Sequence, residues 1–316
     1  MAQYAYLSVT SRCVNRGNLL IDEATWRLLR LDAVRALHFD AHSPLSADDL
    51  DRINSCKALI LPGATLLQPE DHPAALSLNQ VRCPILAIGV ALRSILEVPD
   101  LAVARHIHMP VGSRDPFTHS SLRRAGIRSY LVGCQTLFFG QAREWHRQQG
   151  PVIITLGLGD QARLEACALA CADLGPTIVL VQAPGWQREV FDHPNIEVAA
   201  MADAGQTLAL LSAAALVVTG RLHTLLACVA IGVPVIFLGG WYDSRYSLIE
   251  HLRVPVEPPV PVRIRNLAAE VLAGTMPQSR CFDVAEGLRC AMMRYVEKFA
   301  GPLGLCATPL ASEHIR

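Results

Sequence analysis

The chain has 316 residues, a formal net charge of zero, 51% hydrophobic residues and 18% charged residues. This length exceeds what one hydrophobic core usually serves, so we expect two domains of roughly 150 residues each. The high apolar content excludes a disordered chain, and the balanced charge excludes a globally basic surface for nucleic acid or anionic membranes. Any anion-binding site must therefore be local.

The first half of the sequence predicts alternating strands and helices. Apolar runs bounded by glycine or proline indicate strands at residues 4–10, 34–39, 58–61, 85–88, 109–113 and 129–132. Helices are expected from the loop 12–18 through residue 31, at 47–55 behind Ser46 as N-cap, and at 118–125. Repeated βα units with glycine at strand ends favour a parallel, doubly wound sheet.

The polar segment 141–150 is the best domain boundary, and it predicts one domain over residues 1–145 and a second over residues 146–316. Strands are expected at residues 152–156, 177–182, 196–199, 215–219 and 235–238, and helices at 162–173, 205–213, 266–274 and 284–299. Two Rossmann-like halves with parallel sheets suggest an α/β architecture like the glycosyltransferase B fold. In such a fold the active site lies in the cleft between the domains.

The cysteine pattern and the apolar segments indicate where in the cell the protein is expected. The ten cysteines contain no CxxC pair, so we expect reduced, mostly structural thiols in a cytoplasmic protein. Residues 224–242 are uncharged and long enough to suggest a transmembrane helix, but Gly232 and Pro234 divide the segment into a helix and a strand. We expect neither a signal peptide nor a transmembrane segment. Peripheral membrane contact and a homo-oligomer are left open.

The most informative candidate is His223. An apolar run ends at Gly220, Arg221 and His223 follow at once, and Arg245 comes shortly after the next buried run. Ligands collect at the carboxyl ends of strands in open α/β sheets. A histidine on an apolar helix is more often a core residue, but this position favours function. A titratable histidine between two arginines suits an anionic substrate that must also receive a proton.

Arg114 is a second candidate, because it follows a predicted strand and precedes a predicted helix. Asp115 is the expected N-cap of that helix and Pro116 its first residue, which are structural roles. An arginine in this place can clamp a carboxylate or a phosphate with two hydrogen bonds.

Two glycine-containing turns complete the candidate site. Gly157 and Gly159 precede a helix whose free N–H groups would suit a phosphate, although a tight turn explains them equally well. The next strand lacks a terminal acidic residue, which argues against a bound dinucleotide. Asn15, Gly17 and Asn18 form the first strand-to-helix turn, where glycine permits close approach of a ligand and capping would also explain the asparagines. No GxSxG, HExxH or P-loop motif occurs.

Taken in order, these motifs resemble the polysaccharide pyruvyl transferase family over most of the chain. The matching elements are Asn15-Arg16-Gly17-Asn18 for an NxGD loop, Gly112-Ser113-Arg114-Asp115 for an SxRD element, Leu122–Ile127 (LRRAGI), Gly133-Cys134-Gln135-Thr136 for a GCPT element, Arg221-Leu222-His223-Thr224 with Gly232-Val233-Pro234-Val235 for RLHA…GVPV, and Tyr242-Asp243-Ser244-Arg245 for YDPK. Only the RLH…GVPV part is specific by itself. Asn18 replaces the family aspartate and Arg245 the family lysine.

The resemblance implies transfer of pyruvate from phosphoenolpyruvate to two hydroxyls of a sugar, which forms a ketal and releases phosphate. It implies that Arg114 and Arg245 bind the donor and that His223 protonates the methylene carbon. On the same basis we expect Arg221, Gly157 and Gly159 on the donor side and Asn15, Gly17 and Asn18 on the acceptor side. The scheme needs no metal or cofactor.

Two other functions are compatible with the sequence. One is a glycosyltransferase of the same fold that places the diphosphate of a nucleotide-sugar near residues 157–162 and Arg221. The other is a ligand-binding relative that has lost catalysis. The acceptor is left open as well, because a nucleotide-activated sugar, a lipid-linked intermediate and a finished glycan all fit. No partner nucleic acid is expected.

Overall fold

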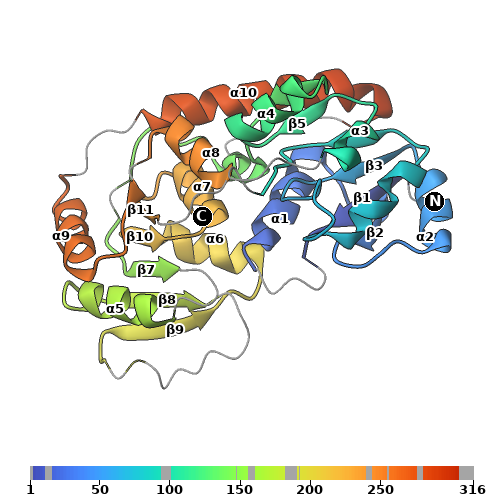
Figure 1. Cartoon of the computed structure of the whole chain (residues 1–316). Coiled ribbons are helices and arrows are strands. Elements are labelled where there is room, and N and C mark those ends of the chain that lie inside the picture. Colours follow the sequence, from blue (N-terminus) through green and yellow to red (C-terminus); the bar gives the residue numbers. More distant parts are fainter. Residues whose placement is uncertain are drawn as a thin grey trace.

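The computed structural model describes residues 3–10, 16–93, 101–146, 148–155, 161–181, 191, 193–239, 244–254, 256–275 and 280–305. These residues form two α/β halves side by side, with one long helix running along both (Figure 1). The strand pairs in both halves are parallel, which confirms the predicted fold class.

The amino-terminal half is built on a four-stranded sheet in the order β2-β1-β3-β4. Its strands are β1 (Tyr4–Ser8), β2 (Ala36–Asp40), β3 (Ala58–Leu61) and β4 (Ile85–Ala87). A pair formed by β5 (Val111–Ser113) and β6 (Ser129–Leu131) continues this layer through a bridge between Val90 and Ser113. The helices of this half are α1 (Asn18–Leu29), α2 (Ala47–Asn54), α3 (Ala102–Arg105) and α4 (Pro116–Arg124), with 3₁₀ helices at Pro73–Gln80 and Gln135–Phe139.

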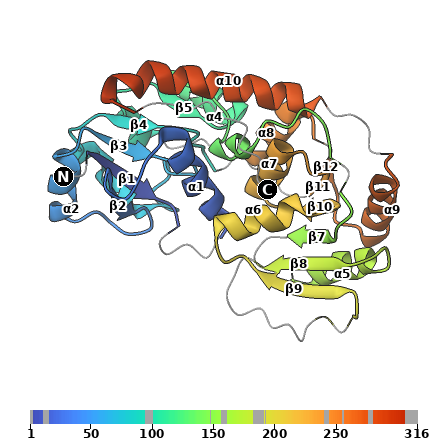
Figure 2. The ribbon, with the colours of Figure 1, turned by 180° about the vertical axis from the view of Figure 1, so that it is seen from behind.

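The carboxyl-terminal half is built on a six-stranded sheet in the order β12-β11-β10-β7-β8-β9. Its strands are β7 (Val152–Thr155), β8 (Thr177–Val181), β9 (Ile196–Ala200), β10 (Leu216–Thr219), β11 (Val235–Leu238) and β12 (Val256–Glu257). The helices are α5 (Gln161–Ala172), α6 (Ala204–Ser212), α7 (Leu222–Ile231), α8 (Ser244–Leu252), α9 (Pro261–Leu272) and α10 (Cys281–Phe299). Helices α5 and α9 lie at the outer end of this half (Figure 2).

Local sequence explains most of these elements. The central strands β3, β10 and β11 are buried along their whole length, as expected for parallel strands covered on both faces. Ser46 begins α2 with a complete capping box, and the Asp115 carboxylate accepts a hydrogen bond from the Thr118 N–H at 2.8 Å. Gly232 ends α7 in the left-handed region, where a Cβ would collide with His146.

Helix α10 joins the two halves. Phe282 and Ala285 near its start pack in the core of the carboxyl-terminal half, whereas Tyr295 and Val296 near its end pack with Tyr4 of β1. The hydroxyl of Tyr295 lies 2.9 Å from the carbonyl oxygen of Ala87 and 2.6 Å from that of Pro110. The chain thus returns to the amino-terminal half after completing the second sheet (Figures 1 and 2). The domain limits 1–145 and 146–316 stay a prediction.

Candidate active site

A pocket of about 380 Å³ lies between the two halves, at the carboxyl ends of strands from both sheets. Residues after β3 and β5 face residues after β10 and the first residue of α8 across it, which is where ligands of open α/β sheets bind. The side chains and backbone that line it are Gly17, Asn18, His42, Ala64, Thr65, Asp71, His72, Arg93, Arg114, Arg221, Leu222, His223 and Ser244.

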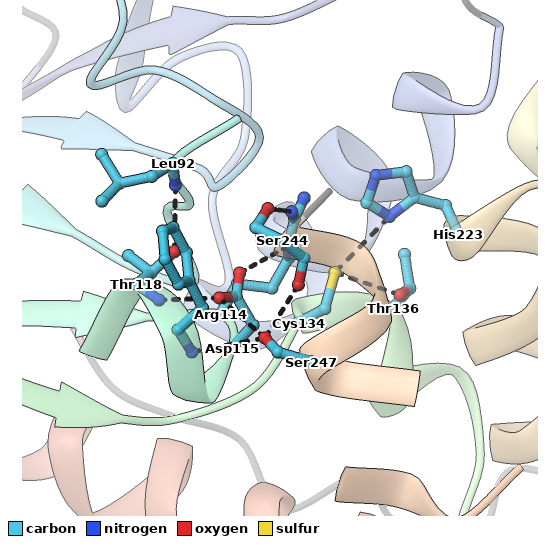
Figure 3. Close-up of polar contacts among 10 residues, drawn as sticks. Leu92, Arg114, Asp115, Thr118, Cys134, Thr136, His223, Ser244 and Ser247 are labelled. Atoms are coloured by element: carbon cyan, nitrogen blue, oxygen red, sulfur yellow. Dashed lines mark hydrogen bonds and ion pairs between the residues drawn. The ribbon is translucent and has the colours of Figure 1, made fainter. Parts of the chain in front are cut away.

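Arg114 enters the pocket from the end of β5 and is held by both halves. Its side chain is only 4% exposed, its Nε lies 3.5 Å from Oδ2 of Asp115, and its Nη2 donates to Oγ of Ser244 at 3.2 Å (Figure 3). Burial raises the pKa of the Asp115 carboxyl, while the positive charge of Arg114 opposes that shift. The guanidinium is therefore a fixed cation in a poorly hydrated site, where its attraction for an anion is strong.

His223 reaches the same pocket from the first turn of α7. Strand β10 ends at Thr219, whose Oγ1 accepts a hydrogen bond from the Arg221 N–H at 3.0 Å and shares another with Thr155 Oγ1 at 2.6 Å. This arrangement orders the short turn that carries Arg221 and His223 into the pocket. The imidazole is half-buried.

A cysteine thiol lies behind the His223 ring. Sγ of Cys134 is 3.6 Å from Nδ1 of His223 and accepts a hydrogen bond from Thr136 Oγ1 at 3.2 Å (Figure 3). Burial raises the pKa of Cys134, so the thiol keeps its proton at neutral pH. A protonated thiol can donate to Nδ1, which favours the tautomer of neutral His223 with its hydrogen on Nε2.

Gln135 holds this cysteine segment in place. The fully buried amide donates from Nε2 to the carbonyl oxygen of Ile88 at the end of β4. Gly89 makes room for it: its φ is +64°, and a Cβ there would lie 2.6 Å from Oε1 of Gln135. The strand end after β6 and the strand end after β4 are therefore locked together beneath the pocket.

The first loop contributes Gly17 and Asn18 to the pocket. Gly17 is the N-cap of α1, and Nδ2 of the buried Asn18 donates to the carbonyl oxygen of Val9 at 3.1 Å. Asn18 thus ties the start of α1 back to the end of β1 and is not the N-cap, which corrects the capping interpretation for this residue. Gly17 has φ −60°, so its role does not depend on a left-handed backbone. Asn15 lies outside the described residues.

The structure brings five of the predicted site residues into one pocket: Gly17, Asn18, Arg114, Arg221 and His223. Gly157 and Gly159 lie outside the described residues. Arg245 belongs to the first turn of α8, next to the pocket residue Ser244, but its side chain lies outside the described part. The functional roles of these eight residues, and that of Asn15, stay predictions.

Sequence reasoning did not identify one wall of the pocket, formed by His42, Thr65, Asp71, His72 and Arg93. His42 comes two residues after the end of β2, so the strand-end argument applied to His223 would have found it. Asp71 and His72 lie further from β3, in a loop without a motif. Their pocket position depends on the folding of that loop.

Residues 15–242 match the family described as "Polysaccharide pyruvyl transferase". The match runs from before β2 to beyond β11 and includes the Arg114 turn and the turn that carries His223. The chain belongs to the polysaccharide pyruvyl transferase family. It is therefore a transferase, as the sequence predicted. A comparison with curated protein sequences gives no match.

Several solved structures have the same fold as this chain. S. aureus MnaA with UDP has a TM-score of 0.64 at 13% identity, covering 96% of this chain and 98% of that one. The UDP-GlcNAc 2-epimerase of Methanocaldococcus jannaschii, in complex with UDP-GlcNAc and UDP, has a TM-score of 0.61 at 13% identity and covers 95% and 100%. The Neisseria meningitidis enzyme with UDP-GlcNAc has a TM-score of 0.60 at 12% identity, with coverage of 95% and 100%. At these identities the likeness establishes the glycosyltransferase B-like fold.

In the part of the chain that the structure describes, no helix combines the length and the apolar character that crossing a bilayer demands. Within the same residues, no group of three or more His, Cys, Asp or Glu side chains is arranged to hold a metal ion.

Proposed function

We propose that this transferase moves pyruvate from phosphoenolpyruvate to two hydroxyls of a sugar in a glycan or its precursor. The observation that carries the proposal is that Arg114, Arg221 and His223 line one pocket between the two halves. Two guanidinium groups match a donor with both a carboxylate and a phosphate. The proposal includes a cytoplasmic location and no requirement for a metal or cofactor.

The pocket residues divide the work of the reaction. Protonated His223 gives its proton to the methylene carbon of phosphoenolpyruvate, so that C2 becomes an oxocarbenium-like centre. One sugar hydroxyl attacks C2, phosphate leaves with the C2–O bond electrons, and the second hydroxyl attacks to close the ketal. Of the two hydroxyl protons, one balances the proton given to carbon and the other leaves with phosphate.

The arginines stabilise the negative charge of the donor and of the departing phosphate during these steps. Arg114 cannot swing freely, because Asp115 and Ser244 hold its guanidinium from two sides. A preorganised cation needs little rearrangement when negative charge grows on the departing phosphate. Arg221 and, on the next helix, Arg245 are the further cations proposed for the donor, and Gly157 and Gly159 are proposed to contact its phosphate.

The test separates donor binding from chemistry. Thermal unfolding is measured with phosphoenolpyruvate, pyruvate, inorganic phosphate and UDP-GlcNAc, each added alone. A ligand at 100 times its Kd stabilises the folded state by about 2.7 kcal/mol, so a raised Tm with phosphoenolpyruvate is expected. Phosphate release is then followed with phosphoenolpyruvate and a panel of UDP-GlcNAc, UDP-galactose and p-nitrophenyl glycosides.

The outcomes point to different functions. Phosphate release that depends on one sugar, with a sugar product heavier by one ketal-linked pyruvate, supports the proposal. A Tm raised only by UDP-GlcNAc would favour a nucleotide-sugar enzyme, in line with the UDP found in the structural relatives of the same fold. A Tm raised by phosphoenolpyruvate without release on any sugar would favour a ligand-binding relative.

A further inference from the structure

Two further histidines, His42 and His72, line the pocket from the amino-terminal half. His72 comes from the loop after β3, immediately before the 3₁₀ helix Pro73–Gln80, and His42 comes from the loop after β2. Their rings lie 4.8 Å apart between centroids. Both line the pocket that contains Arg114 and His223.

His72 is buried without a partner for one of its ring nitrogens. The residue is 3% exposed, and its buried Nδ1 makes no hydrogen bond to any residue that the structure describes. An unsatisfied buried polar atom destabilises the folded state, so such atoms in folded proteins call for an explanation. The ring also lines the pocket, so a ligand bound there is an available hydrogen-bond partner for the imidazole.

The charge state of His72 restricts what that partner is. Burial, followed by the positive charge of a protonated His42, lowers the pKa of His72 to about 4, and Asp71 and Asp40 oppose this shift. At neutral pH the ring is therefore uncharged. A neutral imidazole has one donor and one acceptor nitrogen, which suits a hydroxyl better than a phosphate or a carboxylate.

Hydrogen bonds and an ion pair surround His72 on this side of the pocket. Nε2 of His42 lies 3.2 Å from the carbonyl oxygen of Val9, which can only accept, so Nε2 carries the hydrogen. Asp71 accepts a hydrogen bond from Thr65 Oγ1 at 2.9 Å and pairs with Arg93 at 3.0 Å. The charges of Asp71 and Arg93 cancel, so this pair adds no net charge to the side of the pocket where His72 lies.

We infer that the wall of His42, Thr65, Asp71, His72 and Arg93 is the acceptor subsite, and that His72 positions a hydroxyl of an uncharged sugar ring. The inference rests on the proposed function, because it assigns Arg114 and Arg221 to the anionic donor. His72 is a positioning residue: its hydrogen bond orients the hydroxyl, and His223 supplies the proton to carbon. Asp71, held by Thr65 and Arg93, offers a second fixed oxygen for the same ring.

The test compares His72→Phe, which keeps the ring and the stacking on His42, with His72→Gln, which keeps a hydrogen-bonding group. With the panel sugar that gives the most phosphate release, His72→Phe should raise the acceptor KM roughly tenfold, as the loss of one hydrogen bond implies. The kcat and the Tm shift caused by phosphoenolpyruvate should stay within twofold. His72→Gln should recover part of the KM loss. His38→Phe is the control, because His38 stacks on Trp26 outside the pocket.

A second measurement uses wild-type protein labelled with ¹⁵N-histidine. The imidazole resonances of His72, assigned by their loss in both variants, should move when UDP-GlcNAc or p-nitrophenyl β-galactoside is added, and should not move with phosphoenolpyruvate alone. The acceptor subsite would be overturned if His72→Phe left the acceptor KM unchanged. It would also be overturned if the His72 signal moved with phosphoenolpyruvate and with neither sugar. Neither result would contradict the proposed pyruvyl transfer. A different result is that phosphoenolpyruvate leaves the Tm of the wild-type protein unchanged while the His72 signal moves with a sugar. That result would support the acceptor subsite and exclude phosphoenolpyruvate as the donor.

Discussion

Nη2 of Arg114 donates a hydrogen bond to Oγ of Ser244 at 3.2 Å, although the two residues are 130 positions apart in the chain. Arg114 belongs to the turn after β5 in the amino-terminal half, and Ser244 begins α8 in the carboxyl-terminal half. The backbone N–H of Phe117 repeats the connection by donating to Ser247 Oγ at 3.3 Å. The proposed donor-binding cation is thus fixed at the junction of the two halves.

Replacement of Arg114 should test both anion binding and folding. Arg114→Ala would leave the fully buried Asp115 carboxylate without its ion pair, so a loss of about 3–5 kcal/mol in unfolding free energy is expected. Arg114→Lys keeps the charge but loses the planar fork, and we expect its affinity for phosphoenolpyruvate to fall about tenfold or more. Calorimetric titration measures the affinity and urea unfolding the stability. Wild-type donor affinity in Arg114→Lys would remove the guanidinium from the donor site.

Replacement of His223 should separate proton transfer from binding. His223→Gln keeps hydrogen-bonding capacity but cannot deliver a proton at neutral pH. Turnover should therefore fall by roughly 10²–10⁴, while affinity for phosphoenolpyruvate stays within a few-fold. Steady-state phosphate release gives the first quantity and calorimetry the second, with His38→Gln as the matched histidine control. Near-normal turnover in His223→Gln would exclude His223 as the general acid.

The buried thiols should resist alkylation in the folded protein. Burial raises the pKa of the Cys134 and Cys228 thiols and raises that of Cys171 to about 12. Very little reactive thiolate therefore forms at pH 7.5. Iodoacetamide followed by peptide mass spectrometry should therefore leave all three unlabelled until urea unfolds the chain. Rapid labelling of Cys134 in native protein would contradict its position behind His223.

His72 should make the protein lose stability in mild acid. Its folded pKa of about 4 lies below the unfolded value of 6.5, so the unfolded chain takes up the proton first as the pH falls. The stabilisation is complete above pH 6.5 and is lost as the pH drops through about 4, by at most about 1.4 kcal/mol per pH unit. Urea unfolding at several pH values should show a shallower dependence for His72→Phe than for wild type. Identical slopes would mean that His72 is not buried as a neutral ring.

Local sequence determined the elements that are strongly apolar or clearly capped. The runs that became β3 (Ala58–Leu61) and β11 (Val235–Leu238) were predicted with their observed limits, because a strand buried on both faces must be apolar throughout. Asp115 as the N-cap of α4 and Gly232 as the residue that ends α7 were also predictable from local sequence. The 3₁₀ helix Pro73–Gln80 and helix α8 (Ser244–Leu252) were not predicted, because segments of 8 and 9 residues are too short for the helical spacing of apolar residues to repeat clearly.

The sequence also marked Arg114 and His223 as functional candidates, because each follows a strand of a parallel sheet. Only the tertiary structure decided what surrounds them. The thiol of Cys134 lies behind His223 because Gln135 anchors its segment to the end of β4. His42 and His72 meet because β1 pairs with β2 on one side and with β3 on the other, which brings the loops after β2 and β3 to one edge. Periodicity and capping depend on neighbours in sequence, whereas the opposing walls of a pocket depend on strand order and on the packing of two halves.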